Sequence, residues 1–159
     1  MPSQFAACFC KAIANGYPIS ALMGTDAMKN VASRVFYTGS YWFQSQPMAA
    51  ALATLKELVA MDGPTLMRRI GDKLRDGLVE AGKAHGFDVK ITGASAMPYV
   101  RITNDESQMI HQQWCAECTR RGAYFTPHHN WFVSTAHTDD DIAKTIDIAA
   151  DAFAAIRAE

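Results

Sequence analysis

The hydrophobic period of the chain changes at Gly86, and this change limits the possible folds more than any other feature. Over residues 65–85 the apolar residues recur at steps of three and four, which predicts an amphipathic helix with one side against a core. Over residues 87–91 and 97–102 the apolar residues instead alternate with polar ones, as they do in half-buried strands. A long helix followed by short strands predicts a mixed α/β chain.

The long helix has a predicted inner side and a predicted outer side. We expect its apolar residues to face the core and its charged residues to face water. The inner side consists of Leu66, Ile70, Leu74, Leu78 and Ala81, and the outer side of Arg68, Arg69, Lys73 and Asp76.

The rest of the chain continues the alternation of helices and strands. Thr138 is followed by three aspartates, a pattern typical of a helix start, because the hydroxyl caps the first turn and the acidic groups favour the helix dipole. The sequence predicts a turn or helical piece over residues 11–15, strands over 19–23, 123–125 and 131–134, and helices over 26–33, 47–61, 106–121 and 138–157.

Composition excludes several classes of protein. A chain of 159 residues with 49% hydrophobic and 19% charged residues can bury a core and is not disordered. Its formal net charge of −1 argues against a nucleic-acid-binding surface. No apolar run approaches the length of a membrane span, and the N-terminus does not resemble a signal peptide, so the default expectation is a cytoplasmic protein without membrane contact.

Lys11 is the first candidate functional residue. Residues 10–21 read CKAIANGYPISA, which places this lysine among small apolar residues just before a Gly-Tyr-Pro turn. A lysine in such a place either extends its ammonium group to water or is held as a free amine that can attack a carbonyl. The ordinary interpretation is an exposed lysine beside a turn, and the functional one is a nucleophile.

Thr38 is the second candidate. It lies in a cluster of hydroxyl groups and glycine, FYTGSYWF over residues 36–43, shortly before an alanine-rich helix that opens near Pro47. Hydroxyl groups and free backbone N–H groups near a helix start form a natural seat for a phosphate. The aromatic residues of the same segment are typical of a core or of a dimer interface.

These two segments, in this order, resemble the class III aminotransferases of fold type I, which use pyridoxal 5'-phosphate (PLP). The resemblance extends from about Phe9 to Phe153, includes RGAYFTPHHNWF over residues 121–132, and is closest to the branch containing glutamate-1-semialdehyde 2,1-aminomutase. It implies that the chain corresponds to the C-terminal part of such an enzyme. Residues 1–59 would then end the large PLP-binding domain, and residues 60–159 would form a small C-terminal α/β domain.

The resemblance also implies roles for the two candidates. Lys11 matches the lysine that forms the internal aldimine with PLP and then moves the proton between the substrate carbon and the cofactor. Thr38 matches the threonine that holds the cofactor phosphate, which in this family reaches across the interface of a homodimer into the neighbouring active site. The implied substrate is a small amino acid, amine or keto compound, and the implied reaction is transamination or aminomutation. The alternative is a non-catalytic remnant or split-gene product that pairs with a partner chain.

The four cysteines allow two interpretations. Cys8 and Cys10, together with Cys115 and Cys118, could supply four thiolates to a zinc ion. The second pair, however, falls in a predicted helix, on one face with Ile110 or Trp114, where cysteine packs as a small hydrophobic residue. We therefore expect core packing and no metal site.

The histidines are weaker candidates. Adjacent residues of an extended segment point to opposite faces, so His128 and His129 cannot easily share a metal ion, whereas lining a substrate pocket is an open alternative. We expect His111 to lie at the surface and His137 to lie just before the last helix.

Overall fold

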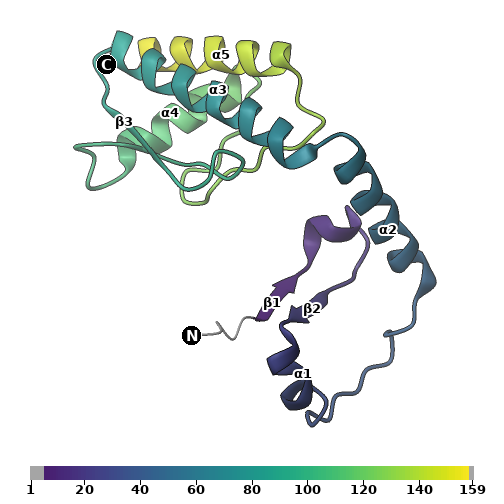
Figure 1. Cartoon of the computed structure of the whole chain (residues 1–159). Coiled ribbons are helices and arrows are strands. Elements are labelled where there is room, and N and C mark those ends of the chain that lie inside the picture. The colour runs from purple at the N-terminus through teal and green to yellow at the C-terminus, as the bar shows by residue number, and fades with distance from the viewer. Residues whose placement is uncertain (1–5, 158–159) are drawn as a thin grey trace. The chain divides into compact units, whose positions relative to one another are not determined.

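The computed structural model describes residues 6–157 and divides into two compact units (Figure 1). The N-terminal unit ends at Asp62, and the C-terminal unit begins at Gly63. Within the described residues, no helix has the length and apolar character needed to cross a membrane.

A β-hairpin with a structured connection forms the start of the N-terminal unit. Strand β1 (Ala6–Phe9) pairs antiparallel with β2 (Ala21–Gly24), with Ala6 opposite Gly24 and Phe9 opposite Ala21. The connection contains a short 3₁₀ helix, η1 (Lys11–Ala14). Asn15 ends η1 in the left-handed conformation with φ of 46°, and Gly16 follows with φ of 111°, a value that glycine adopts without steric cost.

Two helices complete this unit. Helix α1 (Asp26–Ala32) follows β2, and α2 (Ser45–Ala60) packs against η1. The buried residues at this contact are Ala14, Pro47 and Ala51, so the unit has only a small core of its own. Large apolar side chains remain in water, and Phe36 and Phe43 are 90% and 92% exposed.

Three helices and a two-stranded sheet build the C-terminal unit (Figure 1). Helix α5 (Asp139–Arg157) packs against both α3 (Gly63–Ala84) and α4 (Met109–Arg120). Strand β3 (Val89–Thr92) pairs antiparallel with β4 (Tyr99–Ile102), and β3 also contacts α3. The predicted mixed α/β arrangement is confirmed.

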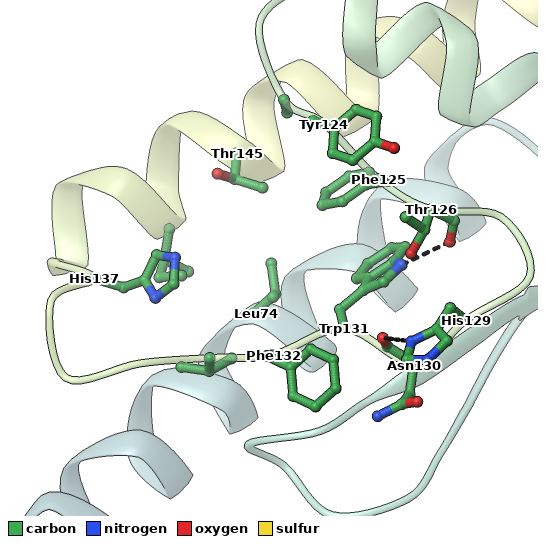
Figure 2. Close-up of a pocket in the computed structure, with 13 residues that line it drawn as sticks. Leu74, Tyr124, Phe125, Thr126, His129, Asn130, Trp131, Phe132, His137 and Thr145 are labelled. Carbon is green, nitrogen blue, oxygen red and sulfur yellow. Dashed lines mark hydrogen bonds between the residues drawn. The ribbon is translucent and has the colours of Figure 1, made fainter. Parts of the chain in front are cut away.

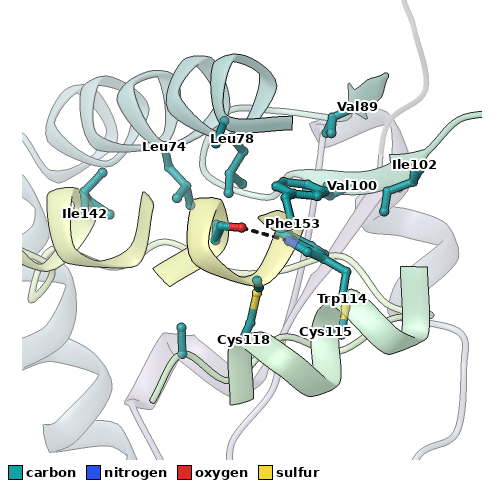
Figure 3. Packing of buried hydrophobic residues seen from close by; sticks show 14 of the residues in the cluster. Leu74, Leu78, Val89, Val100, Ile102, Trp114, Cys115, Cys118, Ile142 and Phe153 are labelled. Carbon is teal, nitrogen blue, oxygen red and sulfur yellow. Dashed lines mark hydrogen bonds between the residues drawn. The ribbon is translucent and has the colours of Figure 1, made fainter. Parts of the chain in front are cut away.

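The core of the C-terminal unit centres on Trp114 and Phe153, whose rings stack 4.7 Å apart (Figure 3). The indole nitrogen of Trp114 donates a hydrogen bond of 3.2 Å to the Ala149 carbonyl on α5, so this large side chain is buried with its polar atom paired. The predicted inner side of α3 is confirmed, because Ile70, Leu74, Leu78 and Ala81 are buried and Leu66 is partly buried in this core.

Helix α5 begins as the sequence predicts. The Thr138 hydroxyl accepts a hydrogen bond of 3.1 Å from the Asp141 backbone N–H, and the Asp141 carboxylate accepts one of 2.9 Å from the Thr138 N–H. This reciprocal pair is a capping box, with aspartate in place of the usual glutamate.

The predicted strands over residues 123–125 and 131–134 are wrong. The Trp131 and Val133 N–H groups each donate a hydrogen bond of 2.9 Å, to the Pro98 and Ala96 carbonyls respectively. Proline has no N–H, so Pro98 cannot return the bond that would close an antiparallel ladder. Ala123 instead donates its N–H to the Cys118 carbonyl and so ends α4.

Candidate functional site

Lys11 is the first residue of η1, and its backbone is strained. Its φ of 58° lies in the left-handed region, which costs a residue with a side chain about 1–2 kcal/mol. Its side chain is exposed, and within the described part of the chain its amine has no ion-pair or hydrogen-bond partner. Backbone strain of this kind is common at functional sites, so Lys11 remains a candidate.

An open hollow lies beside Lys11. Apart from Lys11, none of the residues that line it carries a charge. They are Lys11, Ala12, Asn15, Gly16, Tyr17, Pro18 and Ile19, all from η1 and the turn that follows it.

Thr38 lies in the same unit but does not line this hollow. It is exposed in the loop between α1 and α2. Local aromatic packing shapes its surroundings: the rings of Tyr37 and Trp42 lie 4.5 Å apart, and the Trp42 indole covers Gly39, where a Cβ atom would collide with it. The hydroxyl and glycine cluster is therefore a folded turn, and the structure does not bring Thr38 together with Lys11.

A second hollow, of about 440 Å³, lies within the C-terminal unit (Figure 2). One wall is the segment of residues 123–133, and Leu74 from α3 and Ile142 and Thr145 from α5 complete it. The rings of Phe125 and Trp131 are nearly parallel with centroids 4.0 Å apart, so they stack face to face. The remaining lining residues are Ala123, Tyr124, Thr126, His129, Asn130, Phe132, Val133 and His137.

The side chains of His128 and His129 lie in different surroundings, as the sequence predicts for adjacent residues. The His128 ring donates from Nδ1 to the Gln108 side-chain oxygen at 3.0 Å and does not line the hollow. The His129 ring does line it, and its Nδ1 lies 2.7 Å from the Asn130 carbonyl. His137 is exposed just before α5, as expected, and its Nδ1 accepts a hydrogen bond of 3.0 Å from the Ser134 N–H.

The expectation that His111 lies at the surface is wrong, since this residue is 1% exposed. Asp105 folds back onto α4 and accepts a hydrogen bond of 2.8 Å from the His111 N–H, which turns the imidazole inward. The ring lies 5.8 Å from that of Trp114 and 3.8 Å, at Nε2, from the Cys115 sulfur.

Two buried groups near this turn have shifted pKa values. Burial, followed by the Arg101 charge, lowers the pKa of His111 below its ordinary value. For Asp105, burial opposes ionisation, but hydrogen bonds from the His111 N–H and the Ser107 hydroxyl together outweigh it and lower the pKa of the carboxyl.

Cys115 and Cys118 pack in the core, as predicted, and burial raises the pKa of each thiol to about 12. Cys8 and Cys10 are exposed in the other unit. Among residues 6–157, no group of three or more histidine, cysteine, aspartate or glutamate side chains is placed to hold a metal ion.

The sequence did not indicate the stacked rings of Phe125 and Trp131 or the helix residues that close the second hollow. Phe125 and Trp131 are six residues apart, and Leu74 and Thr145 come from distant helices. The sequence feature that pointed to this hollow was the histidine pair, His128 and His129, of which only His129 lines it.

Several known proteins are similar to this chain in sequence. No family model matches the chain. An aminopentol aminotransferase from Sphingopyxis macrogoltabida is 41% identical over 151 residues, which is 94% of this chain and 35% of that protein. A glutamate-1-semialdehyde 2,1-aminomutase from Akkermansia muciniphila is 28% identical over 155 residues, which is 88% of this chain and 36% of that protein.

Solved structures also match this chain over most of its length. The FumI protein of Sphingopyxis sp. MTA144, in its PLP internal aldimine form, matches 95% of this chain with a TM-score of 0.90 and 39% identity, over 36% of its own chain. The ornithine aminotransferase of Toxoplasma gondii matches 97% of this chain and 38% of its own with a TM-score of 0.81, and at 18% identity this likeness concerns the fold alone.

The chain thus spans little more than a third of the length of the relatives that it matches. Its structure is a partial fold type I structure of mixed α/β type. Matches of this extent to an aminotransferase, to an aminomutase and to the PLP-bearing FumI protein lead to one assignment: the chain belongs to the class III aminotransferase family.

Proposed function

We propose that this chain contributes the reactive lysine, Lys11, and a phosphate-binding threonine, Thr38, to a PLP-dependent aminotransferase. The observation that carries the proposal is the strained left-handed backbone of Lys11 beside an open hollow. The 41% identity with an aminopentol aminotransferase and the 39% identity with a PLP-bearing protein support it.

The residues around Lys11 fit PLP. Ala12, Gly16 and Pro18 leave space for a flat ring, and Tyr17 supplies an aromatic surface at its edge. The amine has no competing partner among the described residues. Lys11 would hold the aldehyde carbon of the cofactor, and Thr38, supplied by a second copy of the chain, would hold the phosphate.

PLP, when bound, supplies an electron sink for the substrate carbon that carries the amino group. The chain's own part would then be acid and base catalysis: Lys11 Nζ would accept the proton from that carbon and would pass it on to the cofactor.

We further propose the domain assignment and the reaction class. Residues 1–59 would belong to the end of a large PLP-binding domain and residues 60–159 to a small C-terminal domain, in a homodimer. The substrate would be an amine, amino acid or keto compound. Amino transfer is favoured over aminomutation, because the identity is 41% with the aminotransferase against 28–30% with aminomutases from several bacteria.

The test is reductive labelling of the purified 159-residue chain. PLP is added, borohydride fixes it to the amine that it occupies, and mass spectrometry identifies the modified lysine. We expect stoichiometric labelling of Lys11, abolished in Lys11→Ala and unchanged in Lys29→Ala, a control at an exposed lysine of α1. Labelling spread equally over the exposed lysines would overturn the proposal.

The role of Thr38 is tested by comparing PLP with pyridoxal, which lacks the phosphate. Loss of one charge-assisted hydrogen bond lowers affinity about tenfold or more. Thr38→Val should therefore weaken PLP binding by that factor and leave pyridoxal binding unchanged. Thr54→Val serves as control, since that hydroxyl bonds the Ala50 carbonyl within α2. Equal effects of the two variants would remove Thr38 from the site.

A second candidate is a non-catalytic remnant or split-gene product that pairs with a partner chain. The exposure of Phe36 and Phe43, together with Tyr37 and Tyr41, favours a unit that packs against another surface. Absent or scattered labelling of the chain alone, restored to Lys11 when a partner chain is added, would favour this candidate.

A further inference from the structure

We propose that the outer face of the β3–β4 sheet binds a phosphate group through Lys90 and Arg101. Neither residue lines the two hollows described above, and the site is independent of the proposed aminotransferase function. Three observations support it: two cations lie opposite each other, no described residue neutralises them, and two hydroxyl groups lie beside them on the same face.

Lys90 and Arg101 are direct partners in the register of the two strands. Opposite residues of an antiparallel pair have Cα atoms about 4.5–5.5 Å apart, and their side chains share one face of the sheet. The neighbouring Val100 and Ile102 are buried in the core (Figure 3). Because side chains alternate along a strand, the two cations lie on the outer face. Like charges placed directly opposite each other destabilise a sheet.

The described part of the chain does not supply a counter-charge for this pair. Neither Lys90 nor Arg101 forms an ion pair with any residue among 6–157. Asp88, two residues before Lys90, is the acidic residue next along this face. Its carboxylate accepts a hydrogen bond of 2.7 Å from the Thr103 hydroxyl instead. The two positive charges are therefore free to bind an anion.

The Arg101 guanidinium is costly in this position. Its side chain is partly buried, and its Nε is buried without a hydrogen-bond partner among the described residues. A buried donor without an acceptor costs free energy, and a charged one costs more. The Arg101 charge also helps to lower the pKa of His111, so it is felt inside the unit. An anion bound to the guanidinium would offset this unfavourable charge.

Thr92 and Tyr99 form the next pair on the same face. Their hydroxyl groups can donate hydrogen bonds to a ligand that lies over the two cations. A phosphate group has three oxygens and about two negative charges near neutral pH, so it can use both cations and the hydroxyl groups together. A carboxylate has one charge and two oxygens and would leave one cation unpaired.

The test is a titration of the isotope-labelled full chain, followed by NMR through the backbone amide signals. Sodium phosphate, sodium acetate and sodium chloride are compared at equal ionic strength. We expect saturable shifts at Lys90, Thr92 and Arg101 with phosphate, and binding about tenfold weaker or undetectable with acetate. Glycerol phosphate is titrated alongside. Tighter binding than that of inorganic phosphate would identify a phosphate ester as the ligand, and equal or weaker binding would identify free phosphate.

Matched variants locate the site. Lys90→Met and Arg101→Met each remove one cation and keep an apolar stem, and each should weaken phosphate binding about tenfold. Lys90 is exposed, so its variant keeps the test valid if Arg101→Met does not fold. Lys144→Met removes an exposed cation from α5 and should have no effect. Equal effects of Lys90→Met and Lys144→Met, or acetate binding as tight as phosphate, would exclude the site.

A charge reversal tests the repulsion between the two cations. Lys90→Glu places opposite charges across the strand pair, so it should raise the Tm in chloride and abolish phosphate binding. Phosphate binding retained by this variant, or a Tm below that of the parent chain, would contradict the inference.

The outcome is separable from that of the proposed function. Lys11→Ala and Thr38→Val should leave the phosphate-dependent shifts at Lys90 unchanged, since neither residue belongs to the β3–β4 sheet. Labelling of Lys11 by PLP without these shifts would exclude only the present inference. Shifts at Lys90 without labelling of Lys11 would keep the phosphate site and count only against the proposed function.

Discussion

Gly71 lets helix α3 approach the turn at Ser95, and its replacement by alanine should be far more costly than the same change at Gly77 on the same helix. A Cβ atom at Gly71 would lie 2.5 Å from the Ser95 carbonyl carbon and closer still to its oxygen. Both atoms are backbone, so the conflict is relieved only if the helix or the turn moves.

At Gly77 the conflict is with a flexible side chain. The added Cβ would meet the end of Ile146, with Cγ1 at 2.7 Å, and that side chain can change rotamer. Both substitutions gain about 1 kcal/mol of helix propensity. Overpacking costs about 1–3 kcal/mol, with the upper end expected where backbone must yield. We therefore expect a loss of about 2 kcal/mol for Gly71→Ala and a change within about 1 kcal/mol of zero for Gly77→Ala.

The assay is thermal and urea unfolding followed by tryptophan fluorescence. In a Trp42→Phe background the remaining tryptophans, Trp114 and Trp131, report only on the C-terminal unit. A loss of about 2 kcal/mol lowers the Tm of a unit of this size by roughly 10 °C. If Gly71→Ala is as stable as the parent, or if both variants lose the same amount, the reasoning from backbone contact is refuted.

Three further changes concern the buried groups of the same unit. The pKa of His111 is lower in the folded state, so the unfolded state binds more protons below about pH 6.5 and the free energy of unfolding should fall as the pH drops below that value. His111→Gln should flatten this pH dependence, which is measured as the difference between the urea midpoints at pH 5 and pH 7.5. Asp105→Ala removes the acceptor for the His111 N–H and should cost about 1 kcal/mol in urea unfolding, whereas an unchanged midpoint would show that this hydrogen bond is not stabilising. Trp114→Phe keeps an aromatic ring but leaves a cavity and loses the bond to the Ala149 carbonyl, with an expected loss of about 2 kcal/mol by calorimetry, and a loss below 0.5 kcal/mol would contradict it.

Patterns among neighbouring residues were sufficient to predict most of the helices. The inner side of α3 follows from spacing alone, because residues three and four apart share a face whatever the helix packs against. The start of α5 could also be predicted from neighbouring residues, because the Thr138 hydroxyl and the Asp141 carboxylate each accept a hydrogen bond from the other residue's backbone N–H. The family resemblance, carried by the segments around Lys11 and Thr38, was borne out by the matched relatives.

The errors arose where distant residues decide the outcome. Residues 131–134 lie beside Pro98, which is more than thirty residues away in the sequence and has no N–H to return a bond to Trp131. The burial of His111 is an exception, because the Asp105 carboxylate that accepts its N–H lies only six residues away. The second hollow combines α3, α5 and the 123–133 segment, and no local pattern indicates that they meet.

The one-way bonding of Trp131 and Val133 to the Pro98 and Ala96 carbonyls has a consequence for motion. Two separate hydrogen bonds, rather than a closed ladder, fasten this wall of the hollow, and the Phe132 N–H between them has no acceptor within the described residues. Amide hydrogen exchange should therefore alternate along the wall, slow at positions 131 and 133 and fast at 132. Moving this wall would break these two bonds and would also take Val133 and Trp131 away from the core, while the pairing of β3 with β4 would stay intact.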